Sequence, residues 1–314
     1  MSPEVVTLGE TMALVAAPEI GLLRHANTLR LSVGGAESNL AIGLSRLGRR
    51  ATWIGRVGDD EFGALVRRTL AAEDVEGRVR VDPDAPTGLM VKYRRTGTTT
   101  QVLYYRKGSA GSRLERADID PDLIRSARVL HLTGITPALS DTARDAVDHA
   151  VEIARDAGVL VSLDLNYRGR LWSPDEAGTV LAILVAHADL VFATEPEAEL
   201  LVTGDNPVQL GQALAGFGPP QVVIKRGALG AVAVIGDEVL DVPAHKVTEV
   251  DPVGAGDAFA AGYLSTLLDG GTPTQCLATG ALAGAFKVTV PGDWEGLPFP
   301  ADLNLLRISE GVLR

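Results

Sequence analysis

The chain has 314 residues and a formal net charge of −11, with 29 Lys and Arg against 40 Asp and Glu. This acidic balance opposes binding to nucleic acid or to an anionic membrane surface, although a few arginines in a cleft can still hold a small anion. Hydrophobic residues make up 46% and charged residues 22%, which supports a folded core and excludes general disorder. The single cysteine, Cys276, cannot form an intrachain disulfide, so we expect a reducing cytoplasm.

Neither a signal peptide nor a membrane span is expected. The N-terminal residues lack a basic region, and His187 and Asp189 interrupt the longest apolar stretch, over 180–192. We therefore expect a globular protein that does not bind a membrane.

The first elements in chain order are mostly strands. Residues 5–8 form a β-branched run that ends at a Gly-Glu turn. Strand composition recurs at 29–33, 89–94 and 101–106, and we expect these segments to form a small sheet. A helix is expected over 38–47, opened by two glycines and ended by Gly48.

After residue 128 the pattern changes to alternating strands and helices. We expect strands over 129–132, 159–164, 190–192, 222–225 and 231–235, and helices over 142–157, 174–187, 256–268 and 274–286. This alternation predicts an α/β fold with a mostly parallel sheet and helices on both faces, whose ligands bind beyond the carboxyl ends of the strands. No clear linker divides the chain, so a single domain over 1–314 is expected.

The most informative segment is Asp251-Pro-Val-Gly254-Ala255-Gly256-Asp257, directly before an apolar helix. Two glycines at a helix start let backbone N–H groups converge on an anion, and the helix dipole favours negative charge there. Asp257 could accept a proton from an attacking hydroxyl. An ordinary aspartate has a pKa of about 3.9, so we expect Asp257 to be ionised at neutral pH. The alternative is that the glycines only make a turn and Asp257 only caps the helix.

A second glycine pair, Gly34-Gly35, precedes the predicted helix over 38–47. It would let a ligand pack directly against the backbone. Asn39 could bind a sugar hydroxyl or cap the helix, and its spacing leaves both alternatives open.

These two segments, together with 55–63, resemble the signatures of the pfkB/ribokinase family of carbohydrate kinases. The resemblance implies a ribokinase-like, mostly parallel sheet flanked by helices, with a small β-sheet lid formed from segments near 10–35 and 88–108. It also implies ATP and Mg²⁺ as cofactors and a homo-oligomer that assembles through the lid strands.

Within that family, 104–110 and 164–168 resemble the 2-keto-3-deoxygluconate kinases. The resemblance implies ATP-dependent phosphorylation of the C6 hydroxyl of 2-keto-3-deoxygluconate, giving the 6-phospho product and ADP. The physical interpretation agrees, because the planar donor forks of Arg106 and Arg168 suit the carboxylate of a sugar acid. The alternatives are a fructokinase or ribokinase acting on a neutral sugar, a non-catalytic sugar- or nucleotide-binding regulator, and an α/β binding protein without phosphate chemistry.

The resemblance also assigns the site residues. It places the sugar acid at Gly34, Gly35, Asn39, Tyr104, Arg106, Arg168, Asp257 and Asp293. It places the nucleotide at Asn166, Arg168, Glu197, Lys225, Gly227, Gly230, Gly254 and Gly256. The catalytic group is Asp257 with Gly254, Ala255 and Gly256, and Glu197 acts on Mg²⁺ indirectly, through water. From the residues alone, Asp293 could be an ordinary turn aspartate and Lys225 a charge that ends a strand. Arg106 and Arg168 could each be a surface arginine or part of a structural ion pair, and Glu197 could only belong to the first turn of a solvated helix.

Overall fold

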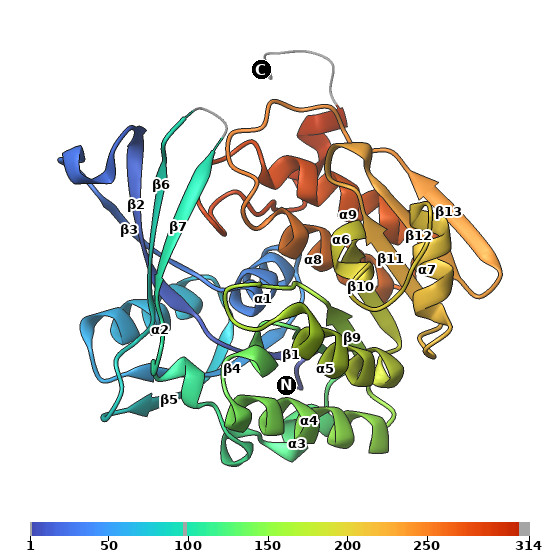
Figure 1. The fold of residues 1–314 in the computed structure, drawn as a ribbon, viewed down its shortest axis with the longest axis horizontal. Coiled ribbons are helices and arrows are strands. Elements are labelled where there is room, and N and C mark those ends of the chain that lie inside the picture. Colours follow the sequence, from blue (N-terminus) through green and yellow to red (C-terminus); the bar gives the residue numbers. More distant parts are fainter. Residues whose placement is uncertain (1, 97–98, 308–314) are drawn as a thin grey trace.

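The computed structural model describes residues 2–96 and 99–307, which form one large and one small sheet with helices around them (Figure 1). The large sheet has the strand order β13-β12-β11-β10-β9-β8-β1-β4-β5. Neighbouring strands from β5 to β11 are parallel. At one edge, β12 is antiparallel to β11 and β13 is antiparallel to β12. The strands are β1 (Val5–Leu8), β4 (Ala51–Gly58), β5 (Glu76–Asp82), β8 (Val129–Thr133), β9 (Leu160–Asp164), β10 (Leu190–Thr194), β11 (Gln221–Lys225), β12 (Ala231–Ile235) and β13 (Glu238–Val242).

Helices cover both faces of this sheet, because alternate residues of each central strand point to opposite sides. Val5 packs into one core and its neighbour Val6 into the other. The first face carries α1 (Ala36–Arg46), α2 (Glu61–Ala72), α8 (Ala255–Leu268) and α9 (Pro273–Lys287). The second carries α3 (Pro121–Arg125), α4 (Asp141–Asp156), α5 (Pro174–His187), α6 (Glu195–Ala198) and α7 (Pro207–Ala215). Short 3-10 turns complete the chain: η1 (Leu23–His25), η2 (Gly111–Arg113), η3 (Arg116–Asp118), η4 (Thr136–Ala138), η5 (Gly227–Leu229) and η6 (Asp302–Arg307).

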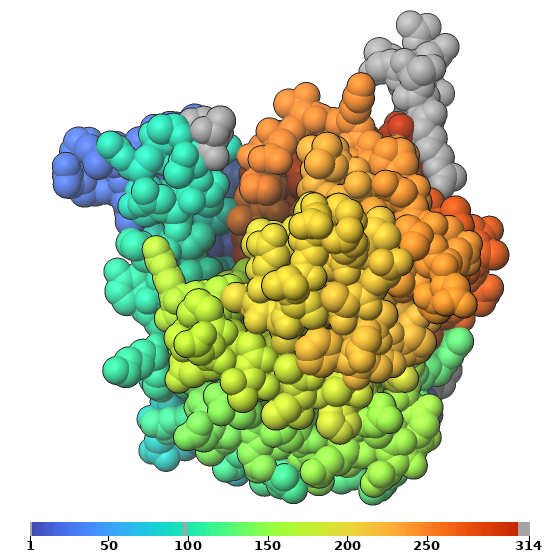
Figure 2. Space-filling model, turned by 45° about the vertical axis from the view of Figure 1, so that its right-hand side comes forward, coloured from blue at the N-terminus to red at the C-terminus, as the bar shows by residue number. Residues whose placement is uncertain are grey.

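The small sheet has the order β3-β2-β6-β7 and stands beside the large one, at the left in Figure 1. Its strands are β2 (Met12–Ile20), β3 (Arg30–Gly34), β6 (Leu89–Arg94) and β7 (Thr100–Tyr105). Figure 2 shows a hollow between this sheet and the body of the molecule. Residues 97 and 98 of the predicted lid segment lie outside the described residues.

The predicted fold class is confirmed, with a mostly parallel sheet, flanking helices and a second small sheet. The expected helix over 142–157 forms one residue earlier, as α4, because the Ser140 hydroxyl accepts a hydrogen bond from the Ala143 N–H at 3.1 Å. Across the described ranges, no helix is both long and apolar enough to cross a membrane.

Strand β4 was not predicted, because Arg56 interrupts its apolar sequence. All eight of its residues are buried. Arg56 is tolerated there because its guanidinium donates to Asp118 at 2.5 Å and also to Glu115. The Asp118 side chain is itself only 3% exposed, so the pair neutralises charge inside the protein.

We predict that Arg56→Met destabilises the protein by about 3 kcal/mol, because it removes the buried cation of Asp118 and leaves this carboxylate only the exposed Arg80, at 3.2 Å. Urea unfolding measures this free energy. Arg78→Met is the matched control, since Arg78 on neighbouring β5 pairs with Glu76 at an exposed position. It should cost no more than about 0.5 kcal/mol. Equal losses in the two variants would contradict the interpretation of Arg56.

Candidate active site

A cavity of about 570 Å³ lies between the small sheet and the carboxyl ends of the parallel strands. Most of the sequence-predicted site residues line it together: Gly34, Gly35, Asn39, Tyr104, Arg106, Asn166, Arg168, Glu197, Lys225, Gly227, Gly254, Gly256, Asp257 and Asp293. Ala255 and Gly230 line a second cavity that adjoins the first. The fold therefore brings together residues that are spread over more than 250 positions of the chain.

The turn before α8 forms one wall of this cavity. Gly254 is the N-cap residue, with a φ of +82° and no side chain capping the helix. A Cβ at this position would lie 2.2 Å from the Asp293 carbonyl oxygen, so only glycine fits. The first backbone N–H groups of α8 have no intrahelical acceptors and face the same region as the positive end of the helix dipole. A helix start of this kind can bind an anion.

Asp257 lies in the first turn of α8 and points to α1. Its carboxylate Oδ2 accepts a hydrogen bond of 2.8 Å from the Asn39 side-chain amide. Because Gly254 and Gly35 are the N-cap residues of the two helices, neither Asp257 nor Asn39 serves as a cap. The capping alternatives for these two residues are wrong.

Burial raises the pKa of Asp257 to about 7, and the nearby negative charge of Asp164 adds to this effect. The hydrogen bond from Asn39 and the charges of Arg168 and Lys225 act in the opposite direction. The expectation of an ordinary aspartate pKa was therefore wrong. The cause is desolvation at the base of the cavity, which sequence spacing does not reveal.

Lys225 ends β11 and contacts Asp164 at the end of β9. Its Nζ donates to Asp164 Oδ2 at 2.6 Å. The other oxygen, Oδ1, is buried and has no hydrogen-bond partner in the part of the chain that the structure describes. Asp164 was not among the predicted site residues, although it begins the segment 164–168. Lys225 is thus part of a buried pair and more than a charge that ends a strand.

Glu197 holds the backbone around the strand ends. Its carboxylate accepts hydrogen bonds from the N–H of Thr194 at 2.8 Å and from the N–H of Tyr167 at 3.1 Å. This ties the start of α6 to the loop after β9, where Asn166 adopts an unusual positive φ of 38°. An indirect role of Glu197 toward Mg²⁺ stays a prediction.

The two arginines differ in their environment. Arg106 is mostly buried, and its Nε donates to Glu10 Oε2 at 2.7 Å, while Glu10 Oε1 accepts from Ser109. Arg168 is exposed and forms no ion pair with any described residue. One edge of Arg106 is therefore occupied by Glu10, whereas Arg168 has no ion-pair partner among the described residues. That both arginines hold the substrate carboxylate stays a prediction.

Asp293 lies beside the glycine pair. It is 4% exposed, and its Oδ2 would lie 2.6 Å from a Cβ on Gly34. Its Oδ1 accepts from Lys92 Nζ at 2.8 Å. Burial raises the pKa of Asp293, and the charge of Lys92 lowers it. Asp293 is therefore a buried, paired carboxylate and does not behave as an ordinary turn residue.

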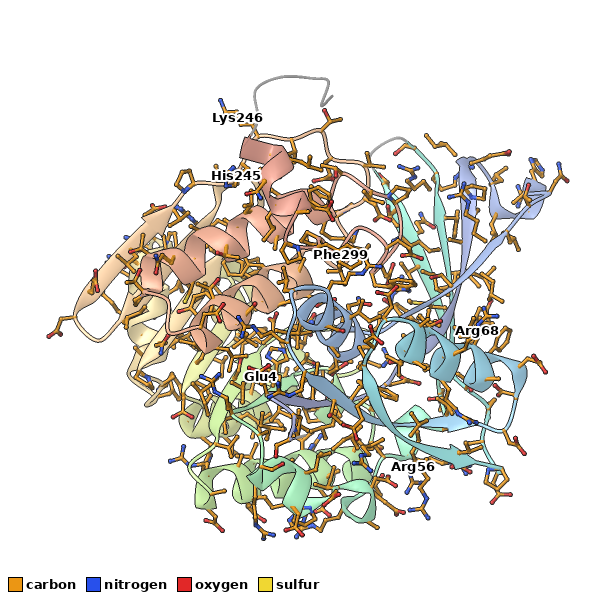
Figure 3. All side chains as sticks on the ribbon, turned by 180° about the vertical axis from the view of Figure 1, so that it is seen from behind. Glu4, Arg56, Arg68, His245, Lys246 and Phe299 are labelled. Carbon is orange, nitrogen blue, oxygen red and sulfur yellow. The ribbon has the colours of Figure 1, made fainter. Side chains whose placement is uncertain are left out.

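The second cavity, of about 490 Å³, continues from the first past Gly227 and Gly256. Small and apolar residues dominate its lining, among them Ala228, Val247, Phe259, Ala281, Ala285 and Val288. His245 and Lys246 lie at its rim, on the loop after β13, and Figure 3 shows them at the end of the molecule away from Arg68 on α2. The lining has the chemistry that suits a flat, weakly polar ring.

Comparison with known proteins agrees with this geometry. The pfkB family of carbohydrate kinases matches residues 2–300. The chain is 39% identical to a 2-dehydro-3-deoxygluconokinase of Bacillus subtilis, covering 95% of this chain and 93% of that protein. It is 36% identical to a 2-dehydro-3-deoxygalactonokinase of Haloferax volcanii, covering 93% of each. A fructokinase of Oryza sativa is 32% identical, covering 98% of each.

A solved structure has the same fold. It is an Escherichia coli protein assigned as a ribokinase II, in complex with ATP and Mg²⁺, and it superimposes with a TM-score of 0.91 at 26% identity. The match covers 98% of this chain and 99% of that one. With the family match over residues 2–300, these findings show that the chain belongs to the pfkB family of carbohydrate kinases.

Proposed function

We propose that this kinase phosphorylates the C6 hydroxyl of 2-keto-3-deoxygluconate with ATP, giving 2-keto-3-deoxy-6-phosphogluconate and ADP. The observation that carries the proposal is the position of the Asp257 carboxylate, which lines the cavity in the first turn of α8 and accepts a hydrogen bond of 2.8 Å from the Asn39 amide. It lies in one cavity with the uncompensated Arg168. Asp257 supplies a proton acceptor beside an anion site, and Arg168 supplies a partner for the carboxylate of a sugar acid.

In the proposed reaction the sugar hydroxyl loses its proton to Asp257 Oδ while its oxygen bonds to the γ-phosphorus of ATP. The bond from that phosphorus to the β-γ bridging oxygen breaks, and ADP leaves. The backbone N–H groups of Gly256 and Asp257 would stabilise the charge on the transferred group. A pKa near 7 suits this task, because the carboxylate is ionised in part at neutral pH and holds the proton once the hydroxyl oxygen has reacted.

The nucleotide would occupy both cavities, with its phosphates at the turn and Lys225 and its base in the apolar space beside Phe259. The residues present also fit Mg²⁺, since Asp164 offers a buried oxygen to which no described residue donates a hydrogen bond. No cluster of three or more potential metal ligands occurs among the residues that the structure describes. This suits Mg²⁺, which is often held by one or two carboxylates together with substrate phosphates. Bound there, the ion would neutralise charge on the β- and γ-phosphate oxygens.

The substrate carboxylate would bind Arg168 first. Arg106 would contribute its remaining Nη1 group, which makes no hydrogen bond within the described ranges and is kept in place by Glu10 and by the Tyr104 ring. Held in this way, the sugar acid would direct its distal hydroxyl to Asp257. The small sheet would exclude water from the cavity, because Met12, Met90 and Val102 line that side.

We also propose that the protein forms a homo-oligomer and is located in a reducing cytoplasm. Strand register places Val15, Leu31, Val91 and Leu103 on the face of the small sheet opposite the cavity. Leu31 is 56% exposed there, and Tyr105 is also exposed. An exposed apolar face of this kind supports contact with a second copy of the chain. The buried thiol of Cys276 suits a reducing compartment.

The main alternative is a neutral sugar, since fructokinases are similar over the whole chain. Within the kinases, a sugar acid is distinguished from a neutral sugar by Arg106 and Arg168, which would pair with a substrate carboxylate, and by the segment 104–106. A non-catalytic regulator is less well supported, because a site that only binds phosphate would gain nothing from the negative charge of Asp257.

Release of ADP over a panel of sugar acids and neutral sugars tests the proposal. We expect 2-keto-3-deoxygluconate to give the highest kcat/KM, and Asp257→Asn to lower kcat by about 100-fold or more while ATP still binds. A higher kcat/KM for fructose or ribose would contradict the proposed substrate. Near-normal turnover of Asp257→Asn would contradict the role of Asp257 as the catalytic base.

The raised pKa of Asp257 predicts a pH dependence. Only the ionised carboxylate accepts a proton, so kcat should fall as the pH drops through about 7. Asn39→Ala removes the hydrogen bond that lowers this pKa, and the acidic limb should then move to higher pH. The measurement is kcat from pH 5 to 9 for both proteins. A limb at the same pH in both would contradict the role of Asn39.

Arg168→Gln should raise KM for the sugar acid by about 10-fold or more and change KM for a neutral analogue much less. Arg170→Gln is the matched control, because Arg170 donates to the Val102 carbonyl and does not line the main cavity. Equal effects on acidic and neutral substrates would show that Arg168 does not bind the carboxylate.

A further inference from the structure

Lys92 is a buried lysine that the proposed chemistry leaves unused. It lies on β6 of the small sheet, opposite Ala16 and Val102, and is only 7% exposed. This register points its side chain into the cavity between the two sheets. A buried ammonium is costly unless it is paired, so its partners indicate what it does.

The partners of Lys92 are two carboxylates that lie outside the small sheet, one in the turn before α8 and one beside Gly34. Lys92 Nζ lies 2.7 Å from Asp251 Oδ2 and 2.8 Å from Asp293 Oδ1. Asp251 begins the anion-binding turn, and its carboxylate also accepts from the N–H groups of Val253 at 3.3 Å and Gly292 at 3.0 Å. The Lys92 ammonium therefore contacts both Asp251, which stabilises the turn, and Asp293, which lies against Gly34.

The second oxygen of Asp293 is directed to the proposed sugar site. Oδ2 lies against the Gly34 backbone, close enough that a Cβ there would be 2.6 Å away. An ionised Oδ2 can accept a hydrogen bond from a sugar hydroxyl. Burial raises the pKa of Asp293, and Lys92 opposes this, so the ammonium keeps Asp293 an acceptor.

The other charged groups of this cluster do not duplicate Lys92. Lys287 is fully buried, but its Nζ donates to the carbonyl oxygens of Asp251 at 3.3 Å and Val290 at 3.4 Å and contacts neither carboxylate. Glu295 accepts from Ser32 on β3 and adds negative charge. Lys92 is thus the cation in contact with both Asp251 and Asp293.

We propose that Lys92 is a positioning residue, which couples the seating of the small sheet to phosphoryl transfer by fixing Asp293 and the 251–257 turn relative to each other. The proposal rests on the proposed position of the sugar between Gly34 and Asp293, and not on which sugar is bound. When the small sheet lies against the rest of the molecule, Lys92 fixes Asp293 and the turn, which keeps the acceptor hydroxyl aligned with the γ-phosphate. When the sheet moves away, both carboxylates lose their cation and that alignment is lost.

The test compares Lys92→Met with Arg94→Met. Arg94 lies two residues further on β6 and donates to the Val250 carbonyl at 3.1 Å, next to the same turn, but pairs with no carboxylate in the described ranges. We expect Lys92→Met to lower kcat by about 100-fold and to raise KM for the sugar, with KM for ATP changed by less than about threefold. Lys92→Arg should recover most of kcat because it restores the charge. Arg94→Met should stay within about twofold of the wild type.

A double-mutant cycle with Asp293→Asn shows whether Lys92 acts through its partner. If it does, Lys92→Met should change KM for the sugar by less than about threefold in the Asp293→Asn background, well below its effect alone. Additive effects, or a Lys92→Met enzyme with wild-type kcat and KM, would overturn the proposal. If Lys92→Met fails to fold, Lys92→Gln, which keeps a hydrogen-bond donor without the charge, takes its place in the same cycle.

The assays use the best substrate from the panel. Wild-type protein that phosphorylates no sugar would contradict the proposed function, whereas an active wild type with an indifferent Lys92 would contradict only the positioning role.

Discussion

The site depends on one turn, 251–257, which must present bare backbone N–H groups to an anion and hold a carboxylate beside it. Gly254 makes the turn possible, because any side chain there would collide with the Asp293 carbonyl. Two effects then compete at Asp257. The helix N-terminus stabilises the ionised carboxylate, typically by less than about 1 kcal/mol, whereas burial and Asp164 disfavour it. The pKa of about 7 shows that desolvation wins, and this makes the carboxylate basic enough to hold a proton.

The charges around the turn are arranged so that the cavity does not accumulate a large positive charge. Lys225 is neutralised by Asp164, Lys92 by Asp251 and Asp293, and Arg106 by Glu10. Arg168 is the cavity arginine without an ion-pair partner among the residues described. In a chain with a net charge of −11, this places attraction for an anion at Arg168 and at the backbone dipoles of α8. The paired cations are largely neutralised by their carboxylate partners.

The sequence predicted the features that depend on residues close together in the chain. Strands β1 and β6 begin and end at the expected residues, because β-branched runs and flanking turns mark them. The motif residues were also found, through glycine spacing and family resemblance. Strand β4 was missed because the partners of Arg56 are 59 and 62 residues away. Glu10 and Lys92 were missed for the same reason, since they pair with residues 96 and 201 positions distant. The pKa of Asp257 could not be predicted either, because it depends on burial created by the whole fold.

Direct titration of Asp257 tests the central claim that burial beside the anion-binding turn gives this carboxylate the basicity that phosphoryl transfer requires. The measurement is the carbon-13 chemical shift of labelled aspartate carboxyl groups between pH 4 and 9, in the wild type and in Asp257→Asn. We expect one carboxyl in the wild type to titrate near pH 7 and to be absent from the variant. If every aspartate signal that the substitution removes titrates below about pH 5, Asp257 is an ordinary aspartate and the claim is wrong.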